Sequence, residues 1–286
     1  MEENVIHVEN VNFSYTKHAF IQDVSFDVKK GEIFGFLGPS GAGKSTLQKI
    51  LTGLIADYTG SSSILGVESK HHGNDFYEKI GVDFEFPSLY EKLTARANLA
   101  YFSSLYKGKR RDVDGLLQEV GLYHHADKKV KDFSKGMKSR LNFIRALVHD
   151  PQVLFLDEPT SGLDPNNAKI MKDMIRKERD QGKTIILTTH NMQDATELCD
   201  RVAFIVDGKV KALDTPHNFI MSKGAVKVNY TYLQDGVECS NSSLLSSISE
   251  DKVLEHLIKT NQITSIHSEE PTLNDIFIEL TGALLC

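Results

Sequence analysis

The chain has 286 residues, of which 40% are hydrophobic and 25% are charged, and its formal net charge at pH 7 is -6. This composition is ordinary for a soluble globular protein, and the length suits one large domain or two smaller ones. The acidic balance and the lack of a clustered basic stripe argue against a surface built for nucleic acid, so we expect no nucleic-acid partner.

Cysteine usage and the start of the chain indicate the compartment. Cys199, Cys239 and Cys286 are few, odd in number and scattered, which fits a reducing cytoplasm better than a disulfide framework. The first ten residues, MEENVIHVEN, are acidic and lack the apolar core of a signal peptide. No apolar run approaches the roughly 18 residues that a membrane-spanning helix needs. We therefore expect any membrane role to come through a partner.

The first strong signal is an apolar strand followed by a glycine-rich loop and a helix. Residues 33–37 (IFGFL) predict a strand buried on both faces, and TLQKILTGL predicts a helix. The loop between them matches G-x-x-x-x-G-K-[ST], whose backbone N–H groups and helix N-terminus face phosphate oxygens. Lys44 is placed for the β- and γ-phosphates, and the Ser45 hydroxyl for Mg²⁺. The predicted phosphate cradle comprises Gly38, Pro39, Ser40, Gly41, Ala42, Gly43, Lys44, Ser45 and Thr46.

Two weaker stretches follow the cradle. SSSILGVE, residues 61–68, is rich in turn formers, and KHHGND, residues 70–75, reads as a solvated surface loop. In IGVDFEFPSLYEKLT, apolar positions alternate with Asp83 and Glu85, which predicts a short strand with both acids on the face opposite the apolar one. Pro87 should end this strand because it cannot donate to a sheet ladder. By itself, the pattern makes Glu85 a solvated acid on a strand edge.

Two further strands end in polar residues. Residues 153–156 predict a buried strand that leads into Asp157, which would hold Mg²⁺ through its water shell. Glu158 follows at once, where a carboxylate can polarise a water that attacks the γ-phosphate. KTIILTTH ends in His190, and although a lone histidine is more often structural, this one is a reasonable γ-phosphate sensor. Together these strands predict a parallel α/β sheet with its site at the carboxyl edge.

The remaining segments define the organisation of the chain. Residues from about 85 to 150 should be mostly helical, and ARANLAYFSSLY shows apolar residues at helical spacing. Beyond residue 215 the character changes and no nucleotide motif occurs. There we expect a hairpin at 224–240, a serine-rich polar connection at 241–251, a helix at 251–261, a strand at 262–270 and a last helix at 271–282.

These motifs resemble those of the ATP-binding cassette (ABC) ATPases over nearly the whole chain. GPSGAGKST resembles the Walker A loop, VLFLDEP the Walker B strand, SGLD with Asp164 the D-loop, and His190 the switch histidine. Tyr15 sits where the family stacks an aromatic ring on adenine, and its alternative is a strand aromatic in the core. The resemblance implies an α/β fold: a P-loop ATPase core with an N-terminal antiparallel β subdomain, a helical subdomain at about 85–150 and a small α+β appendage. We place the ATPase domain at 1–215 and the appendage at 216–286.

The stretch DFSKGMKSRL resembles the family's L-S-G-G-Q signature at the start of a helix. Ser134 and Gly136 remain, and they supply a hydroxyl and a backbone N–H that would face phosphate. Lys135 replaces a small residue and would either add positive charge beside the nucleotide or point into solvent. By the family pattern the signature closes over ATP held by a second cassette. The resemblance therefore implies a dimer with two ATP molecules at its interface, most economically a homodimer, with a heterodimer left open.

Glu85 gains a second interpretation from the resemblance. The family usually has a glutamine at this place, in a pattern near I-G-x-x-x-Q-x-P-x-L. Glutamate has the same length, so it can still reach the metal and the attacking water, but it adds charge. The resemblance thus implies a metal site of Ser45, Glu85 and Asp157, with Glu85 also serving in coupling.

The implied function is the ATP-hydrolysing subunit of an ABC exporter, with ATP and Mg²⁺ as cofactors. A drug, an antimicrobial peptide or a similar cargo would cross a separate membrane permease. The chain would be cytoplasmic and peripheral on the inner face of the membrane through that permease. The C-terminal segment resembles the appendage of drug- and lantibiotic-export ATPases. The alternatives are a soluble ABC ATPase without a transport role and a nucleotide-gated regulator.

Overall fold

A computed structural model describes residues 3–85, 88–222, 227–234 and 236–282. Expectations for Phe86, Pro87, Cys286 and the first residues of the hairpin lie outside these ranges. The chain divides into two compact units, the first ending at Leu213 and the second beginning at Asp214. Within the described ranges, no helix combines the length and the hydropathy that crossing a bilayer requires.

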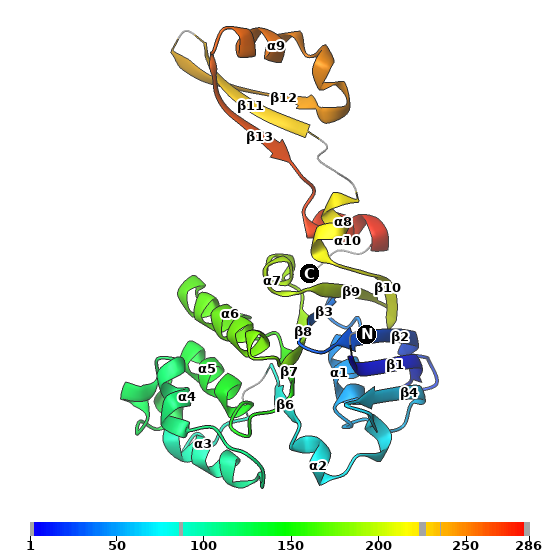
Figure 1. The fold of residues 1–286 in the computed structure, drawn as a ribbon, viewed down its shortest axis with the longest axis vertical. Coiled ribbons are helices and arrows are strands. Elements are labelled where there is room, and N and C mark those ends of the chain that lie inside the picture. The colour runs from blue at the N-terminus through cyan, green and yellow to red at the C-terminus, as the bar shows by residue number, and fades with distance from the viewer. Residues whose placement is uncertain (1–2, 86–87, 223–226, 235, 283–286) are drawn as a thin grey trace. The chain divides into compact units, whose positions relative to one another are not determined.

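An antiparallel sheet opens the first unit, as the resemblance implies (Figure 1). Its order is β2-β1-β4-β5, with β1 at Asn4–Phe13, β2 at Ile21–Lys29, β4 at Thr59–Ile64 and β5 at Val67–Glu68. The turn-rich expectation for residues 61–68 is therefore only partly right, because the turn is confined to Leu65 and Gly66 between β4 and β5. Ser62 is fully buried and pairs with Val8 of β1, and its hydroxyl lies 3.1 Å from that of Ser69. Serine fits this buried strand because its hydroxyl has a partner.

A six-stranded sheet forms the centre of the unit, with the order β10-β9-β3-β8-β7-β6. Its strands are β3 (Ile33–Leu37), β6 (Ile80–Asp83), β7 (Val153–Asp157), β8 (Thr184–Thr189), β9 (Arg201–Val206) and β10 (Lys209–Asp214). Every residue of β3, β7 and β8 is buried, and β6, β7, β8, β3 and β9 pair in parallel. The predicted parallel α/β sheet is confirmed, and its strand ends share one edge.

Helices follow the strands and also form a separate helical region. The helices of this unit are α1 (Lys44–Leu51), α2 (Asn74–Tyr77), α3 (Ala95–Ser104), α4 (Val113–Glu119), α5 (Lys135–Arg145), α6 (Pro165–Asp180) and α7 (Met192–Leu198), with short 3-10 turns at Ser69–His71, Tyr123–His125 and Val130–Asp132. Helices α3, α4 and α5 pack on one another (Figure 1). Each begins at a polar cap, Thr94, Asp112 or Ser134, whose side chain accepts a backbone N–H of the first turn.

One surface prediction needs correction around His72. The side chain is partly buried, its Nδ1 donates to the Ser69 carbonyl at 2.8 Å, and Tyr77 donates its hydroxyl to Nε2 at 2.6 Å. His71 is exposed, as a solvated loop requires. The solvated-loop prediction therefore holds for His71 but not for His72, whose side chain packs against its neighbours.

The second unit contains a three-stranded antiparallel sheet and three helices. Its elements are α8 (Pro216–Met221), β11 (Lys227–Gln234), β12 (Val237–Leu244), a 3-10 segment (Leu245–Glu250), α9 (Lys252–Lys259), β13 (Ile263–Glu269) and α10 (Leu273–Thr281), and the strand order is β12-β11-β13. Tyr230, Leu254 and Leu257 form its buried cluster. The serine-rich connection is partly wrong, because residues 241–244 continue β12, where backbone pairing with β11 suffices to hold polar side chains in a strand.

Candidate active site

The glycine-rich loop leaves β3 and encloses the start of α1. A side chain at Gly38 would place its Cβ 2.1 Å from the Ile205 carbonyl oxygen, so only glycine fits there. Gly43 has φ 110°, and a Cβ at this residue would also approach Ile21 Cδ1 to 2.7 Å. Glycine at these two positions therefore permits the tight turn that precedes α1, whose first N–H groups can face a phosphate.

Lys44 is the cation of this loop and is only 8% exposed. Its ammonium donates to the carbonyl of Gly38 at 2.7 Å and to that of Pro39 at 3.1 Å, so it points into the concave side of the loop. Burial lowers the pKa of Lys44, and the nearby carboxylates of Glu158, Asp157 and Glu85 oppose this shift. The loop, the lysine and three acids therefore lie within one electrostatic environment.

The end of β7 places two carboxylates beside β8. Asp157 is buried, and Thr188 donates its hydroxyl to one of the aspartate oxygens. Glu158 has φ 51°, a left-handed conformation that is uncommon for a residue other than glycine. Thr189 donates to Glu158 Oε2 at 3.3 Å, and His190 Nδ1 donates to Oε1 at 2.8 Å. The structure thus brings Glu158 and His190 together, with the second ring nitrogen of His190 left for another group.

A cavity of about 330 Å³ adjoins this pair. Its lining comprises Glu85, Phe133, Lys135, Lys138, Ser139, Glu158 and Ser161. Glu85 is exposed and comes two residues after the end of β6. The two acids therefore do not share a solvated face, because Asp83 is only 5% exposed while Glu85 faces the cavity.

Magnesium fits the donor atoms at this edge. Among the described residues, no group of three or more His, Cys, Asp or Glu side chains could hold a metal ion by itself. A Ser45 hydroxyl and an Asp157 carboxylate are hard oxygen donors, and Mg²⁺ in such sites takes its remaining ligands from water and phosphate. The pair would therefore bind the ion together with a nucleotide.

The signature stretch begins α5 on the opposite side of the cavity. Ser134 caps the helix by accepting the Met137 N–H at 3.3 Å. A Cβ built on Gly136 would lie 3.1 Å from Asn167 Nδ2, and one on Gly162 would lie 2.1 Å from Lys135 Nζ. Lys135 therefore lies across the glycine of its own D-loop, at the rim of the cavity, and not away from the site.

Asp164 and Tyr15 complete the predicted set. Asp164 caps α6 by accepting the backbone N–H groups of Asn166 and Asn167 at 3.1 Å, and these hydrogen bonds lower its pKa. Tyr15 is 57% exposed, which makes the alternative of a core aromatic wrong. Its hydroxyl lies 3.1 Å from that of Thr46 on α1, and its ring makes edge contacts with the rings of Phe13 and Phe20.

Sequence reasoning missed two buried polar residues near the site, Asn142 and Asp194. Asn142 of α5 donates to Asp83 of β6, and burial raises the pKa of Asp83 to about 7 although Arg145 opposes the shift. Asp194 of α7 is also buried and binds residues from α6 and from the segment after β7. No local pattern marks either residue, because their partners come from distant parts of the chain.

Comparisons with known proteins show which proteins this chain resembles. The profile of the ABC transporter family matches residues 21–161. A fluoroquinolones export ATP-binding protein of Mycobacterium tuberculosis is 45% identical over 98% of this chain and 94% of its own length. Nod factor export ATP-binding protein I of Rhizobium meliloti is 35% identical over 97% of this chain and 88% of its own. Among solved structures, an ATP-binding subunit of an ABC transporter superposes with a TM-score of 0.70 and 29% identity, covering 77% of this chain and 93% of that one.

Proposed function

Because the chain belongs to the ABC transporter family of ATP-binding proteins, we propose that it is the ATP-hydrolysing subunit that powers an exporter. The observation that carries this proposal is the contact between Glu158 and His190 beside the loop of Lys44. Relatives matched over nearly the full chain are named export ATP-binding proteins, which favours export over a soluble ATPase or a regulator.

In the proposed reaction, Lys44 and the N–H groups of α1 bind the terminal phosphates, and Tyr15 stacks on the base. Ser45, Asp157 and Glu85 would hold Mg²⁺, which would supply positive charge beside the phosphates. Glu158 accepts a proton from the attacking water, and His190 holds the Glu158 carboxylate in place while its free nitrogen faces the γ-phosphate. The remaining loop residues from Gly38 to Thr46 shape the cradle around these groups.

The proposed working unit is a dimer of residues 1–215, with residues 216–286 as an appendage that interacts with a partner or stabilises the dimer. The N-terminus of α5, with Ser134 and Gly136, would face the nucleotide of the second copy, and Asp164 would lie at the same interface. A separate permease would hold the dimer at the inner face of the membrane and would bind its helical subdomain. The cargo would be a drug, an antimicrobial peptide or a similar compound.

The proposal is tested with the purified chain and the membrane protein that co-purifies with it. We expect the chain alone to hydrolyse MgATP, and the pair in vesicles to hydrolyse it faster and to accumulate a fluoroquinolone used as the first cargo probe. Hydrolysis without any stable membrane partner would overturn the exporter assignment in favour of a soluble ATPase. Absence of hydrolysis in both preparations would overturn the enzymatic assignment.

A further inference from the structure

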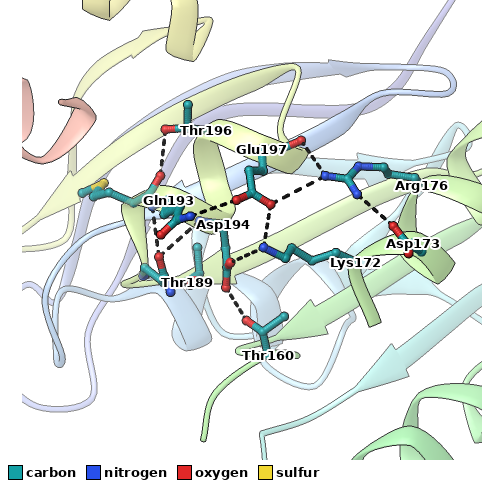
Figure 2. Close-up of polar contacts among 11 residues, drawn as sticks. Thr160, Lys172, Asp173, Arg176, Thr189, Gln193, Asp194, Thr196 and Glu197 are labelled. Atoms are coloured by element: carbon teal, nitrogen blue, oxygen red, sulfur yellow. Dashed lines mark hydrogen bonds and ion pairs between the residues drawn. The ribbon is translucent and has the colours of Figure 1, made fainter. Parts of the chain in front are cut away.

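A network of polar side chains joins α6 to α7 (Figure 2). Lys172 of α6 is 14% exposed, and its ammonium lies 3.2 Å from Asp194 Oδ1 and 2.5 Å from Glu197 Oε2, both on α7. Asp194 is only 6% exposed. A buried carboxylate is costly unless it is paired and hydrogen-bonded, so the contact with Lys172 stabilises Asp194 at this position.

The second oxygen of Asp194 points to the segment that follows β7. Thr160 donates its hydroxyl to Asp194 Oδ2 at 2.5 Å, as Figure 2 shows. Thr160 is two residues after Glu158 and directly precedes Ser161 and Gly162 of the D-loop. The contact therefore ties the start of the D-loop to the helix that follows His190.

The same helix is joined to Glu158 by a second path. Asn191 caps α7 by accepting the Asp194 N–H at 3.2 Å, and its own N–H donates to Thr189 Oγ1 at 2.9 Å. Thr189 then donates to Glu158 Oε2 at 3.3 Å. A closed ring thus runs from Glu158 through Thr189, Asn191, Asp194 and Thr160 and returns along the chain to Glu158.

This ring explains how Glu158 is held at φ 51°. A residue other than glycine keeps a left-handed backbone conformation only where several surrounding contacts restrain it. Hydrogen bonds reach Glu158 from Thr189 and His190, and the Thr160 contact restrains the backbone on its other side.

We propose that Thr160 and Asp194 are positioning residues for hydrolysis, with Lys172 as the cation that pairs with Asp194. Their contact sets the distance between the Glu158 and His190 turns and the orientation of the D-loop. This inference rests on the proposed function, since it assigns the two residues a role in the same hydrolysis. A purely structural staple between α6 and α7 would change the stability of the fold but not the rate per folded molecule.

Three threonine variants of the full chain test the proposal. Thr160→Val keeps the shape and removes the donor, Thr160→Ser restores it, and Thr196→Val removes an α7 hydroxyl that donates only to the Met192 carbonyl at 2.8 Å. We expect Thr160→Val to lower kcat about ten- to a hundredfold, because small misplacement of catalytic groups has effects of this size. The KM for ATP should stay close to that of the wild type. The melting temperature should fall, because Asp194 loses a hydrogen bond in a buried position, so kcat is compared per folded molecule. Thr160→Ser and Thr196→Val should keep kcat within about twofold.

A double variant with Asp194→Asn completes the test. Because Thr160 and Asp194 act through one contact, their combined effect on kcat should be far smaller than the product of the single effects. An unchanged kcat in Thr160→Val, a failure of Thr160→Ser to restore it, or multiplicative effects would overturn the inference. A wild-type chain without MgATP hydrolysis would instead overturn the proposed function, so the two failures are distinguishable.

Discussion

Two helix N-termini in this chain are candidates for binding phosphate, and they differ in how completely the chain itself surrounds them. The start of α1 is enclosed by its own loop, and Lys44 is buried with two carbonyl partners. The start of α5 is exposed at Ser134, whose hydroxyl is used to cap its own helix. Both helix ends carry partial positive charge.

The difference teaches which half of a nucleotide site this chain builds alone. At α1, a buried cation, a restricted loop and three carboxylates occupy one environment. At α5, Ser134 is exposed, and Asn167 near the start of α6 lies close to Gly136. The first half-site is preformed within the chain, whereas the second presents an exposed serine at its helix end. The proposed dimer would place a second copy against that helix end.

The largest expected effect comes from Glu158→Gln, which leaves both helix ends intact. Removing the charge deletes the group that orients the water, and loss of such a group lowers the rate by about 10²–10⁴. ATP binding should persist, so the two half-sites should close on ATP and stay closed. Gel filtration with MgATP should show a trapped dimer. A variant that remains monomeric while the wild type dimerises would contradict the two-half-site comparison.

Lys44→Ala should damage the preformed half-site directly. Removing a charge-assisted contact to phosphate typically costs about 1.5–3 kcal/mol, which weakens ATP binding roughly ten- to a hundredfold. Titration calorimetry with ATP measures the change. Lys49→Ala is the matched control, because Lys49 is an exposed lysine on the same helix. If Lys44→Ala binds ATP like the control, the loop assignment is wrong.

The elements around the preformed half-site were the ones predictable from sequence. Strands β3 and β7 are continuous apolar runs followed by motif residues. This pattern predicts strands that are buried on both faces of a parallel sheet. The prediction failed at Asp83. The alternating pattern placed this residue on a solvent-exposed face, whereas in the structure it is buried and accepts a hydrogen bond from Asn142, 59 residues away. It also missed the contact of Thr160 with Asp194, which are 34 residues apart. Such pairs depend on tertiary packing that no local period records.

Ser134→Ala tests the second half-site. The change removes a helix cap, which costs about 1 kcal/mol of stability, and also a hydroxyl that would face the partner's nucleotide. We expect ATP binding by the isolated chain to stay unchanged and hydrolysis to fall by roughly tenfold, because one hydrogen bond to charge is worth about this much. Thr94→Ala, which removes the equivalent cap of α3, is the control. If Ser134→Ala and Thr94→Ala lose activity equally, Ser134 acts only as a helix cap and has no role at the nucleotide.

The anchor of α5 to the sheet predicts a pH effect. Burial raises the pKa of Asp83 to about 7, so the folded chain keeps a proton that the unfolded chain releases near its ordinary value. The free energy of unfolding should therefore fall as pH rises from about 4 to about 7. Asp83→Asn lacks this component, so its stability relative to the wild type should rise across that window by on the order of 2–4 kcal/mol. Urea unfolding without nucleotide at several pH values measures it, and parallel curves would contradict the prediction.

The smallest expected effect concerns Glu85, which lies between the two half-sites in the cavity that also contains Glu158 and Lys135. A carboxylate binds Mg²⁺ more strongly than an amide does, but it also repels the γ-phosphate and Glu158. Glu85→Gln should therefore raise the half-saturating Mg²⁺ concentration about threefold and leave the fold unchanged, because size and shape are kept. Since losing a ligand slows hydrolysis while relieving repulsion speeds it, kcat should change less than the Mg²⁺ dependence.

The matched control is Glu91→Gln, because Glu91 is an exposed acid that pairs with Lys138 at 2.6 Å. A Mg²⁺ titration of ATPase activity with and without the permease separates the cases. If the curves superimpose on those of the wild type in both conditions, Glu85 has no role at the metal and is a solvated acid beyond the end of β6.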